Sequence, residues 1–319
     1  MLNLRRVSLL SVLILGFIAC CAHFGAGQLA ASGFQEAALA PLKASKPEVM
    51  PEPPREDSGR VHFKPAGTKP MEKVTLVAVG PEGFVYAGDP GAGRVLRFKP
   101  SGELASQFPL QETRSPWTGL AVDRGGTVYV AAGDRLFRYE GGTGKLLGEV
   151  RHPDGPGFFH VAPRPDSGVI ASWRNPRRDD LVLVDGEGAI ETIHRNAVSG
   201  ATGEPMGDVL VAMDGRRTLY AAVSKLHAVC VFEFTGKYVN RFGSDGAEPG
   251  QFSGPFTGLT VDGQQRIFVS DAKGVSIFSD AGRYLRQSEA HGTGLAVSDD
   301  DELFAANGTE IVKYSAGEP

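Results

Sequence analysis

Residues 115–131 read SPWTGLAVDRGGTVYVA, and residues 254–270 read GPFTGLTVDGQQRIFVS. In both stretches a short apolar run leads into a turn that contains Asp and Gly, and a second, alternating run follows. Alternation with a period of two is typical of β-strands, and Asp and Gly favour a tight turn between them. Each stretch therefore predicts an antiparallel pair of strands.

The same pattern recurs along the chain from Lys73 onward. Six copies can be superposed, with the first strand of each copy ending at Gly80, Asp123, Pro163, Asp214, Asp262 and Ser298. Their separations are 43, 40, 51, 48 and 36 residues, which is close to the roughly 40–50 residues of a four-stranded propeller blade. The sequence therefore predicts an all-β fold, a six-bladed β-propeller with four-stranded blades.

The first strands also indicate what surrounds the axis of the ring. One position is nearly always small, as in Ala78, Ala121 and Ala212, which suits crowded strands near an axis. In this alignment a neighbouring position is aliphatic in five copies and is His160 in the third. We therefore expect His160 to place a polar ring among apolar neighbours.

The sixth copy lacks a fourth strand, because its last run is EIVKYS at residues 310–315. An open sheet edge promotes aggregation, and propellers remove it by closing the ring with a strand from the other end of the chain. The run RVHFK at residues 60–64 can supply this strand. We expect it to pair beside residues 311–314, so that the propeller spans residues 60–319.

Three stretches resemble NHL-repeat propellers. They are residues 115–131, residues 254–287 and above all RFGSDGAEPGQFSGP at 241–255, which is similar to the inter-blade loop of that family. The resemblance covers residues 73–315, with a divergent third copy, and implies a six-bladed ring. NHL propellers mostly bind other molecules, and their relatives include lactonases and amidating lyases, so the resemblance leaves binding and catalysis open.

The N-terminal 59 residues indicate export. Arg5 and Arg6 precede an uncharged run at residues 7–22, which is the layout of an export signal, so residues 1–27 are expected to be a signal peptide or a membrane or lipid anchor. Ala19 before Cys20 resembles a bacterial lipoprotein signal and makes Cys20 the candidate lipidation site. Residues 28–59 are rich in Pro and Ala and predict a disordered linker. The protein is therefore expected in the cell envelope, as a membrane-anchored protein or lipoprotein, or secreted.

The charge balance excludes one class of partner. The chain has 33 Lys and Arg against 37 Asp and Glu, a net charge of −4, whereas a nucleic-acid surface is basic. The run SWRNPRRDD at residues 172–180 is the most basic cluster, and we expect it to be a solvated loop. No nucleic-acid partner is expected.

Two histidines are candidate ligand contacts. His160 and His291 could face the same mouth of the channel, and together with a carboxylate they could hold a metal ion. However, neither belongs to a close ligand spacing such as HxxxH. For His160 the favoured interpretation is a histidine that is hydrogen-bonded locally, because buried polar groups usually find a partner without having a functional role.

Four further candidates lie where the first strands begin. Thr118 and Thr257 share one column, so their hydroxyls could ring the channel, although Thr also fits any pleated surface. Trp117 and Phe256 stand beside them and could form an aromatic platform for a sugar or peptide, or simply pack between blades.

These features favour a binding or interaction scaffold for a protein, peptide or glycan in the cell envelope, with no cofactor and no assignable catalytic residue or metal ligand. The alternative is a metal-dependent hydrolase or lyase, lactonase-like or amidating-lyase-like, which would need a divalent metal at the channel mouth. For a lactonase the resemblance implies a Glu, Asn and Asp set. The asparagines of the ring stand in no such motif; they are Asn175, Asn196, Asn240 and Asn307.

Overall fold

The computed structural model describes residues 60–110, 115–203 and 207–315. The expectations for residues 1–59, namely the export segment, the lipidation of Cys20 and the linker, lie outside these residues. Within the described ranges, no helix is both long and apolar enough to cross a membrane. The helices that they contain are short: α1 (Ala197–Thr202) and 3-10 turns at Pro81–Gly83 and Ser224–Leu226.

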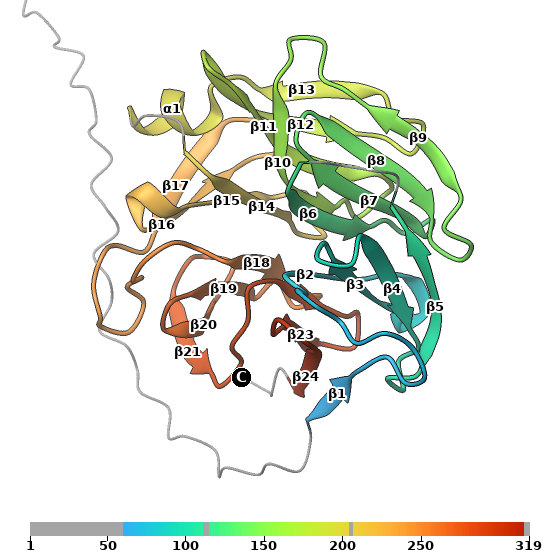
Figure 1. Cartoon of the computed structure of the whole chain (residues 1–319). Helices are drawn as coiled ribbons and strands as arrows, with labels where there is room; N and C mark the ends of the chain where they lie inside the picture. Colours follow the sequence, from blue (N-terminus) through green and yellow to red (C-terminus); the bar gives the residue numbers. More distant parts are fainter. Residues whose placement is uncertain (1–59, 111–114, 204–206, 316–319) are drawn as a thin grey trace, which may run out of the picture. The chain divides into compact units, whose positions relative to one another are not determined.

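The strands form six separate sheets, and blades 1 to 3 each follow the order of the chain (Figure 1). Blade 1 contains β2 (Leu76–Val79), β3 (Val85–Asp89), β4 (Arg94–Phe98) and β5 (Leu104–Pro109). Blade 2 contains β6 (Trp117–Val122), β7 (Thr127–Ala132), β8 (Arg135–Glu140) and β9 (Leu146–Val150). Blade 3 contains β10 (Gly157–Pro163), β11 (Val169–Asn175), β12 (Arg178–Val184) and β13 (Ile190–His194).

Blades 4 to 6 repeat this arrangement, except that the last strand of blade 6 comes from the start of the described chain. Blade 4 contains β14 (Val209–Met213), β15 (Leu219–Val223), β16 (Ala228–Phe232) and β17 (Tyr238–Phe242). Blade 5 contains β18 (Gly258–Val261), β19 (Ile267–Asp271), β20 (Gly274–Phe278) and β21 (Tyr284–Ser288). Blade 6 contains β22 (Leu295–Val297), β23 (Glu302–Ala306), β24 (Ile311–Ser315) and β1 (Val61–Phe63). The predicted all-β, six-bladed propeller with four-stranded blades is confirmed.

Strand β1 closes the ring. It pairs antiparallel with β24, with Phe63 opposite Ile311, and the two strands lie side by side in Figure 1, β1 in blue and β24 in dark red. The Phe63 ring is fully buried and meets Phe98 of blade 1 and Phe304 of blade 6 edge to face, with centroid distances of 5.8 and 5.7 Å. This one side chain therefore joins the two ends of the described chain in a shared core.

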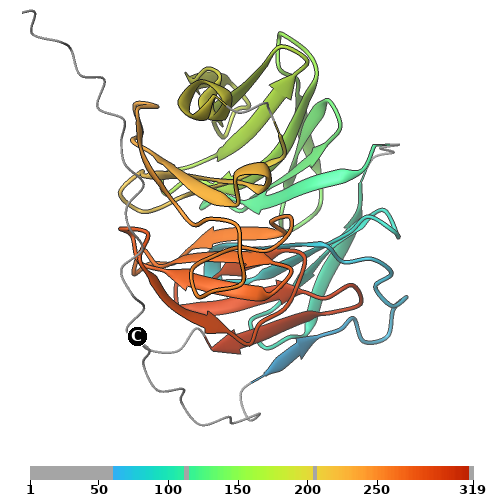
Figure 2. The same cartoon turned by 90° about the vertical axis from the view of Figure 1, so that its left-hand side faces the viewer.

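The first strand of each blade lies innermost, and each innermost strand contacts the next around the ring (Figures 1 and 2). Corresponding positions meet, because a Cβ added to Gly258 would touch Leu295 and one added to Gly294 would touch Thr75 and Leu76. The innermost strands therefore run in the same direction. We call the end of the channel where these strands begin the start mouth, and the other end the end mouth.

The register of blade 3 corrects the alignment proposed from the sequence. Val161 lies opposite Ala171, as Leu120 lies opposite Val130 in blade 2. Val161, and not His160, therefore occupies the aliphatic column. The misalignment arose because Arg164 stands where blades 2, 4 and 5 carry an Asp at the turn, so this turn signal is missing from the third copy.

Buried aspartates hold the turns at the end mouth. The Asp123 carboxylate accepts the Thr127 amide at 2.9 Å and the Tyr129 hydroxyl at 3.1 Å, and it also accepts the Gly168 amide of blade 3 at 3.1 Å. Asp214 accepts its own turn amides and the Tyr220 hydroxyl in the same way. A buried carboxylate needs several donors to offset its lost hydration. The repeated Asp of the sequence pattern is therefore accounted for by turn formation.

Candidate functional site: the central channel

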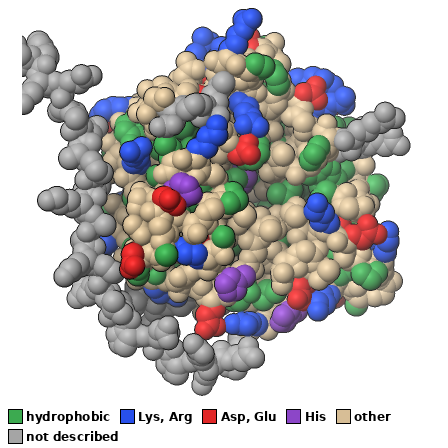
Figure 3. All heavy atoms as spheres, turned by 60° about the vertical axis from the view of Figure 1, so that its left-hand side comes forward, with side chains coloured by type: hydrophobic (Ala, Val, Ile, Leu, Met, Phe, Trp, Pro, Cys, Tyr) green, Lys and Arg blue, Asp and Glu red, His purple; other side chains and the backbone are tan. Residues whose placement is uncertain are grey.

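The six innermost strands enclose a channel with a cavity volume of about 140 Å³. The residues that line it carry no charge, and its polar side chains are Thr118, His160, Thr257, Thr260 and Thr293. On the outer face in Figure 3, by contrast, side chains of both charges are interspersed. The interior of the ring is therefore a distinct, apolar environment with a few hydrogen-bonding groups.

His160 is fixed by hydrogen bonds that join blade 3 to blade 4. Its backbone N–H donates to the Ser172 Oγ at 3.1 Å, and this hydroxyl donates to the Val209 carbonyl at 2.7 Å. Its ring Nδ1 accepts the Val211 N–H at 3.2 Å. Strand β10 bulges between Phe158 and His160, which sets the ring at the seam between β10 and β14.

The ring of His160 is neutral at physiological pH. Burial disfavours the imidazolium and lowers the pKa of His160 from its ordinary 6.5 to about 4. Since Nδ1 accepts the Val211 N–H, the hydrogen-bond geometry assigns the single ring proton to Nε2. No hydrogen bond from this Nε2–H to a described residue is present, and His160 borders the channel cavity. The channel therefore contains a neutral donor that remains available.

The position of His160 is a packing position in the other blades. It is occupied by Leu76, Gly119, Leu210, Gly258 and Gly294. A Cβ on Gly119 would lie 2.9 Å from the Val161 nitrogen, and one on Gly294 would lie 2.6 Å from the Thr75 oxygen. This position therefore faces the next blade, and His160 is its polar member.

The two predicted threonines line the channel, and both hydroxyls have partners in the protein. The Thr118 Oγ1 donates to the Phe158 carbonyl at 3.3 Å. The Thr257 Oγ1 lies 2.9 Å from the Ser270 Oγ and 3.2 Å from the Gly292 carbonyl. Because a hydroxyl that donates to the protein keeps lone pairs, these side chains can still accept a hydrogen bond in the channel.

The structure does not bring His291 to the channel. This side chain lies over Gly274, the first residue of β20, whose added Cβ would meet the imidazole Nδ1 at 3.1 Å. His291 is absent from the channel lining, whereas His160 is part of it. The two histidines therefore do not form the shared site that the sequence suggested.

The two aromatic candidates are packing residues. Phe256 is 7% exposed and meets Phe252 edge to face at 4.8 Å. Trp117 is half-buried and packs against the core shared by blades 1 and 2. Neither ring is part of the channel lining, and both pack against cores between blades.

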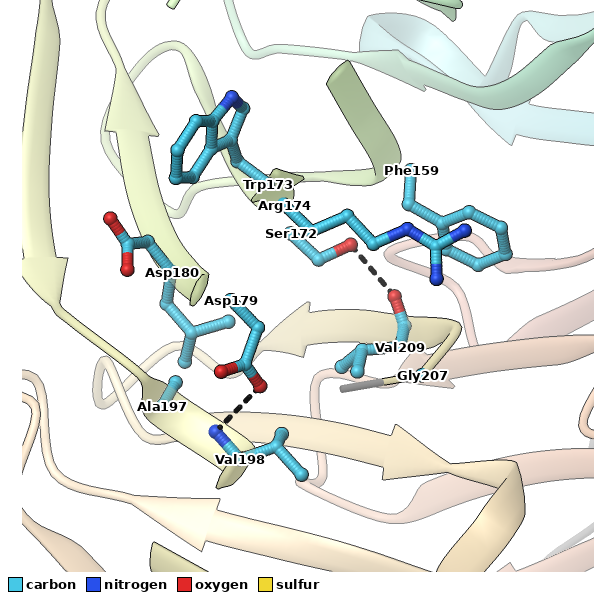
Figure 4. A pocket seen from close by; sticks show the side chains of 11 residues that line it. Phe159, Ser172, Trp173, Arg174, Asp179, Asp180, Ala197, Val198, Gly207 and Val209 are labelled. Carbon is cyan, nitrogen blue, oxygen red and sulfur yellow. Dashed lines mark hydrogen bonds between the residues drawn. The ribbon is translucent and has the colours of Figure 1, made fainter. Parts of the chain in front are cut away.

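The basic run at residues 172–180 is a β-hairpin rather than a solvated loop, and it borders a second pocket beside α1 (Figure 4). Its Asp179 is buried and accepts the Val198 and Ser199 amides at 3.2 and 3.1 Å, which holds the first turn of α1. The cavity volume is about 10 Å³, which suits about one water molecule. This pocket is therefore part of the scaffold.

Comparisons with known proteins support the fold. No known protein family and no curated protein matches the chain. Among solved structures, a gluconolactonase from Xanthomonas campestris matches with 14% identity and a TM-score of 0.57, over 80% of this chain and 88% of that one. A catalytically inactive virginiamycin B lyase from Staphylococcus aureus with quinupristin matches with 11% identity and a TM-score of 0.57, over 81% and 88%. The calcium-binding protein regucalcin from Agrobacterium tumefaciens matches with 14% identity and a TM-score of 0.56, over 77% and 90%.

These lactonase-like and lyase-like neighbours raise the question of a metal ion in the channel. Calcium takes six to eight oxygen ligands, with carboxylates among them. The channel lining supplies no carboxylate. In the part of the chain that the structure describes, no three His, Cys, Asp or Glu side chains gather closely enough to hold a metal. The donor set of this channel therefore does not fit a calcium ion.

Proposed function

We propose that this chain is an exported, NHL-like propeller of the cell envelope that works as a binding protein, and that its ligand enters the central channel from the start mouth. The observation that carries this proposal is the uncharged channel into which His160 presents an available N–H. Concave, mostly apolar sites with a few placed polar groups are typical of ligand binding.

The channel favours some ligands of the predicted classes over others. A neutral peptide-like group or small molecule suits an apolar lining that offers both donors and acceptors. A glycan is less well supported, because neither Phe256 nor Trp117 lines the channel, so the channel itself offers a sugar no aromatic ring to stack on. Export and envelope location rest on the sequence of residues 1–27.

The second candidate is a metal-dependent hydrolase or lyase. Its support is the similarity in fold to a gluconolactonase and to streptogramin lyases. Against it stands the lining of the channel, which supplies no carboxylate ligand. His160 is also poorly suited to act as a general base, because its pKa is low and its Nδ1 lone pair is already engaged.

Thermal unfolding of the full chain separates the two functions. The melting temperature is measured in EDTA and then with added calcium, zinc or manganese, because an ion that binds only the native state raises it. The binding proposal expects no change with any ion. A rise of several degrees with one ion would replace it with the metal-dependent enzyme.

Cell fractionation tests the location of the protein. We expect the full chain in the envelope fraction and covalently labelled by a supplied fatty acid, and the Cys20→Ser variant unlabelled, with Cys21→Ser as the matched control. A full chain that stays in the cytosol would overturn export, and a full chain that takes up no label would overturn lipidation.

A further inference from the structure

We propose that the channel takes a neutral, mostly apolar molecule with one carbonyl-type oxygen, and that the Nε2–H of His160 donates to this oxygen. The inference rests on the proposed binding function and adds the chemical class of the ligand and the group that orients it. It follows from the size of the channel, its charge and the geometry of His160.

The size of the cavity limits the ligand. Its volume is about 140 Å³, and an apolar protein cavity of about 150 Å³ accommodates a benzene ring. The part of the ligand that enters the channel is therefore a group of about six or seven heavy atoms. A larger ligand would leave the remainder at the mouth.

The charge of the lining limits it further. The walls of the cavity are alkyl side chains, among them Leu120, Val161 and Leu210, and no Lys or Arg lines it. An ionised carboxylate would lose its hydration there without gaining a partner of opposite charge. A neutral molecule avoids this cost, so the channel should bind neutral ligands in preference to charged ones of the same size.

The geometry of His160 provides the recognition. Its Nδ1 accepts the Val211 N–H and its backbone N–H donates to Ser172, so the orientation of the ring is set by the protein itself. The Nε2–H borders the channel cavity, so an acceptor on the ligand can take its hydrogen bond inside the apolar lining. A hydrocarbon of the same size leaves the donor unsatisfied, so the site prefers a carbonyl compound.

His160→Asn separates the recognition of ligand from the structural role of the ring. An Asn Oδ1 can replace Nδ1 as the acceptor of the Val211 N–H, whereas no group remains at the position of Nε2. The variant therefore keeps the link between blades 3 and 4 and removes the donor from the position of Nε2, because the Asn amide nitrogen takes the place of the ring Cδ2, closer to the backbone. His291→Asn is the matched control, since this histidine lies outside the channel lining.

The experiment titrates the full chain, labelled with ¹⁵N in its histidines, with cyclohexanone, methylcyclohexane and cyclohexanecarboxylate. We expect cyclohexanone to move the Nε2 resonance of His160. The parent chain should bind methylcyclohexane about tenfold more weakly than cyclohexanone, and the His160→Asn protein should bind cyclohexanone about tenfold more weakly than the parent chain does. Binding to the His160→Asn protein is followed by the rise in its melting temperature. The His291→Asn protein should bind cyclohexanone as the parent chain does.

The inference fails if cyclohexanone leaves the Nε2 resonance unchanged up to its solubility, if the carboxylate binds equally well, or if His160→Asn binds cyclohexanone unchanged. These results would leave the broader binding function standing, because another ligand could still enter the start mouth. A melting temperature raised by a metal ion would remove the proposed function itself, so the two failures are distinguishable.

Discussion

The seam between blades 6 and 1 and the seam between blades 3 and 4 join neighbouring blades by different means. At the first, Phe63 packs between Phe98 and Phe304, and Gly294 lets the innermost strands approach closely. At the second, Ser172 and His160 hydrogen-bond to the backbone of β14. Both seams contain an apolar core, so the difference lies in the side-chain hydrogen bonds that the seam between blades 3 and 4 adds beside the channel.

This difference shows where the ring of blades can present a polar group to a ligand. Apolar packing is non-directional and stabilises a seam without leaving any group unsatisfied. A link through histidine leaves one hydrogen-bonding group without a partner in the protein, because an imidazole has two nitrogens and the protein uses one of them. The seam between blades 3 and 4 is therefore the place where the wall of the channel offers a hydrogen-bond donor, beside the acceptors that Thr118 and Thr257 provide elsewhere.

The largest expected effect comes from opening the apolar seam. Phe63→Ala should lower the free energy of unfolding by about 3–5 kcal/mol, because a fully buried ring is lost and a cavity remains between the first and last blades. Chemical denaturation measures this change, and hydrogen exchange of the β24 amides reports whether the closing strand loosens.

Phe278→Ala is the control for Phe63→Ala. Phe278 is equally buried but belongs to a strand inside blade 5. It should cost a similar free energy without faster exchange at β24. Slow exchange at β24 in the Phe63→Ala protein would contradict the role of this ring in closure.

The next effect comes from the polar seam. His160→Leu leaves the buried Val211 N–H without an acceptor and should destabilise the fold by about 2–3 kcal/mol. His160→Asn should recover most of this loss in the same denaturation experiment. Equal stability of the Leu variant and the parent chain would show that the hydrogen bond across this seam contributes nothing.

A smaller effect is expected where the apolar seam depends on glycine. Gly294→Ala places a Cβ 2.6 Å from the Thr75 backbone oxygen, so the strands must separate, at a cost of about 1–2 kcal/mol. Gly263→Ala is the matched control, because nothing lies within 4 Å of its added Cβ. The difference between the melting temperatures of the two variants measures the cost of separating the innermost strands of blades 6 and 1. Equal melting temperatures would contradict the requirement for glycine at this position.

The period of the repeat carried enough information to predict the fold, because each blade repeats the same alternation and the same turn chemistry. Blade 3 shows the limit of this information. Arg164 replaces the turn aspartate, so the sequence placed His160 one position from its true column. Only the strand register reveals that this column faces the next blade.

The candidate site was predicted in part. The alternation of the first strands pointed to the channel residues Thr118, Thr257 and His160, which the structure places in the lining. It could not separate them from Phe256, which lies on a neighbouring position but turns into the core between blades. The donor of the polar seam, the Val211 N–H, lies 51 residues from its acceptor, the Nδ1 of His160, so no local sequence pattern indicates this pair.

The smallest effect expected is the pH dependence of the polar seam. The pKa of His160 is about 4 in the folded protein and 6.5 as an ordinary value, so between these values the unfolded chain binds a proton that the folded chain excludes. Stability is therefore full above pH 6.5, falls as the pH drops through this window, and levels off below about pH 4. From pH 7.5 to 5.5 the expected loss is about 1 kcal/mol.

The groups that face His160 give this dependence a single source. Ser172 on β11, Val209 and Val211 on β14 and Thr118 on β6 are uncharged, and the channel holds no titratable carboxylate. His152 and His194 also have pKa values lowered by burial, so the parent chain must be compared with His160→Asn at each pH. The part of the loss in stability that disappears in this variant belongs to His160 at the seam between blades 3 and 4. Identical pH profiles of the two proteins would mean that protonation of His160 does not change the stability of the fold.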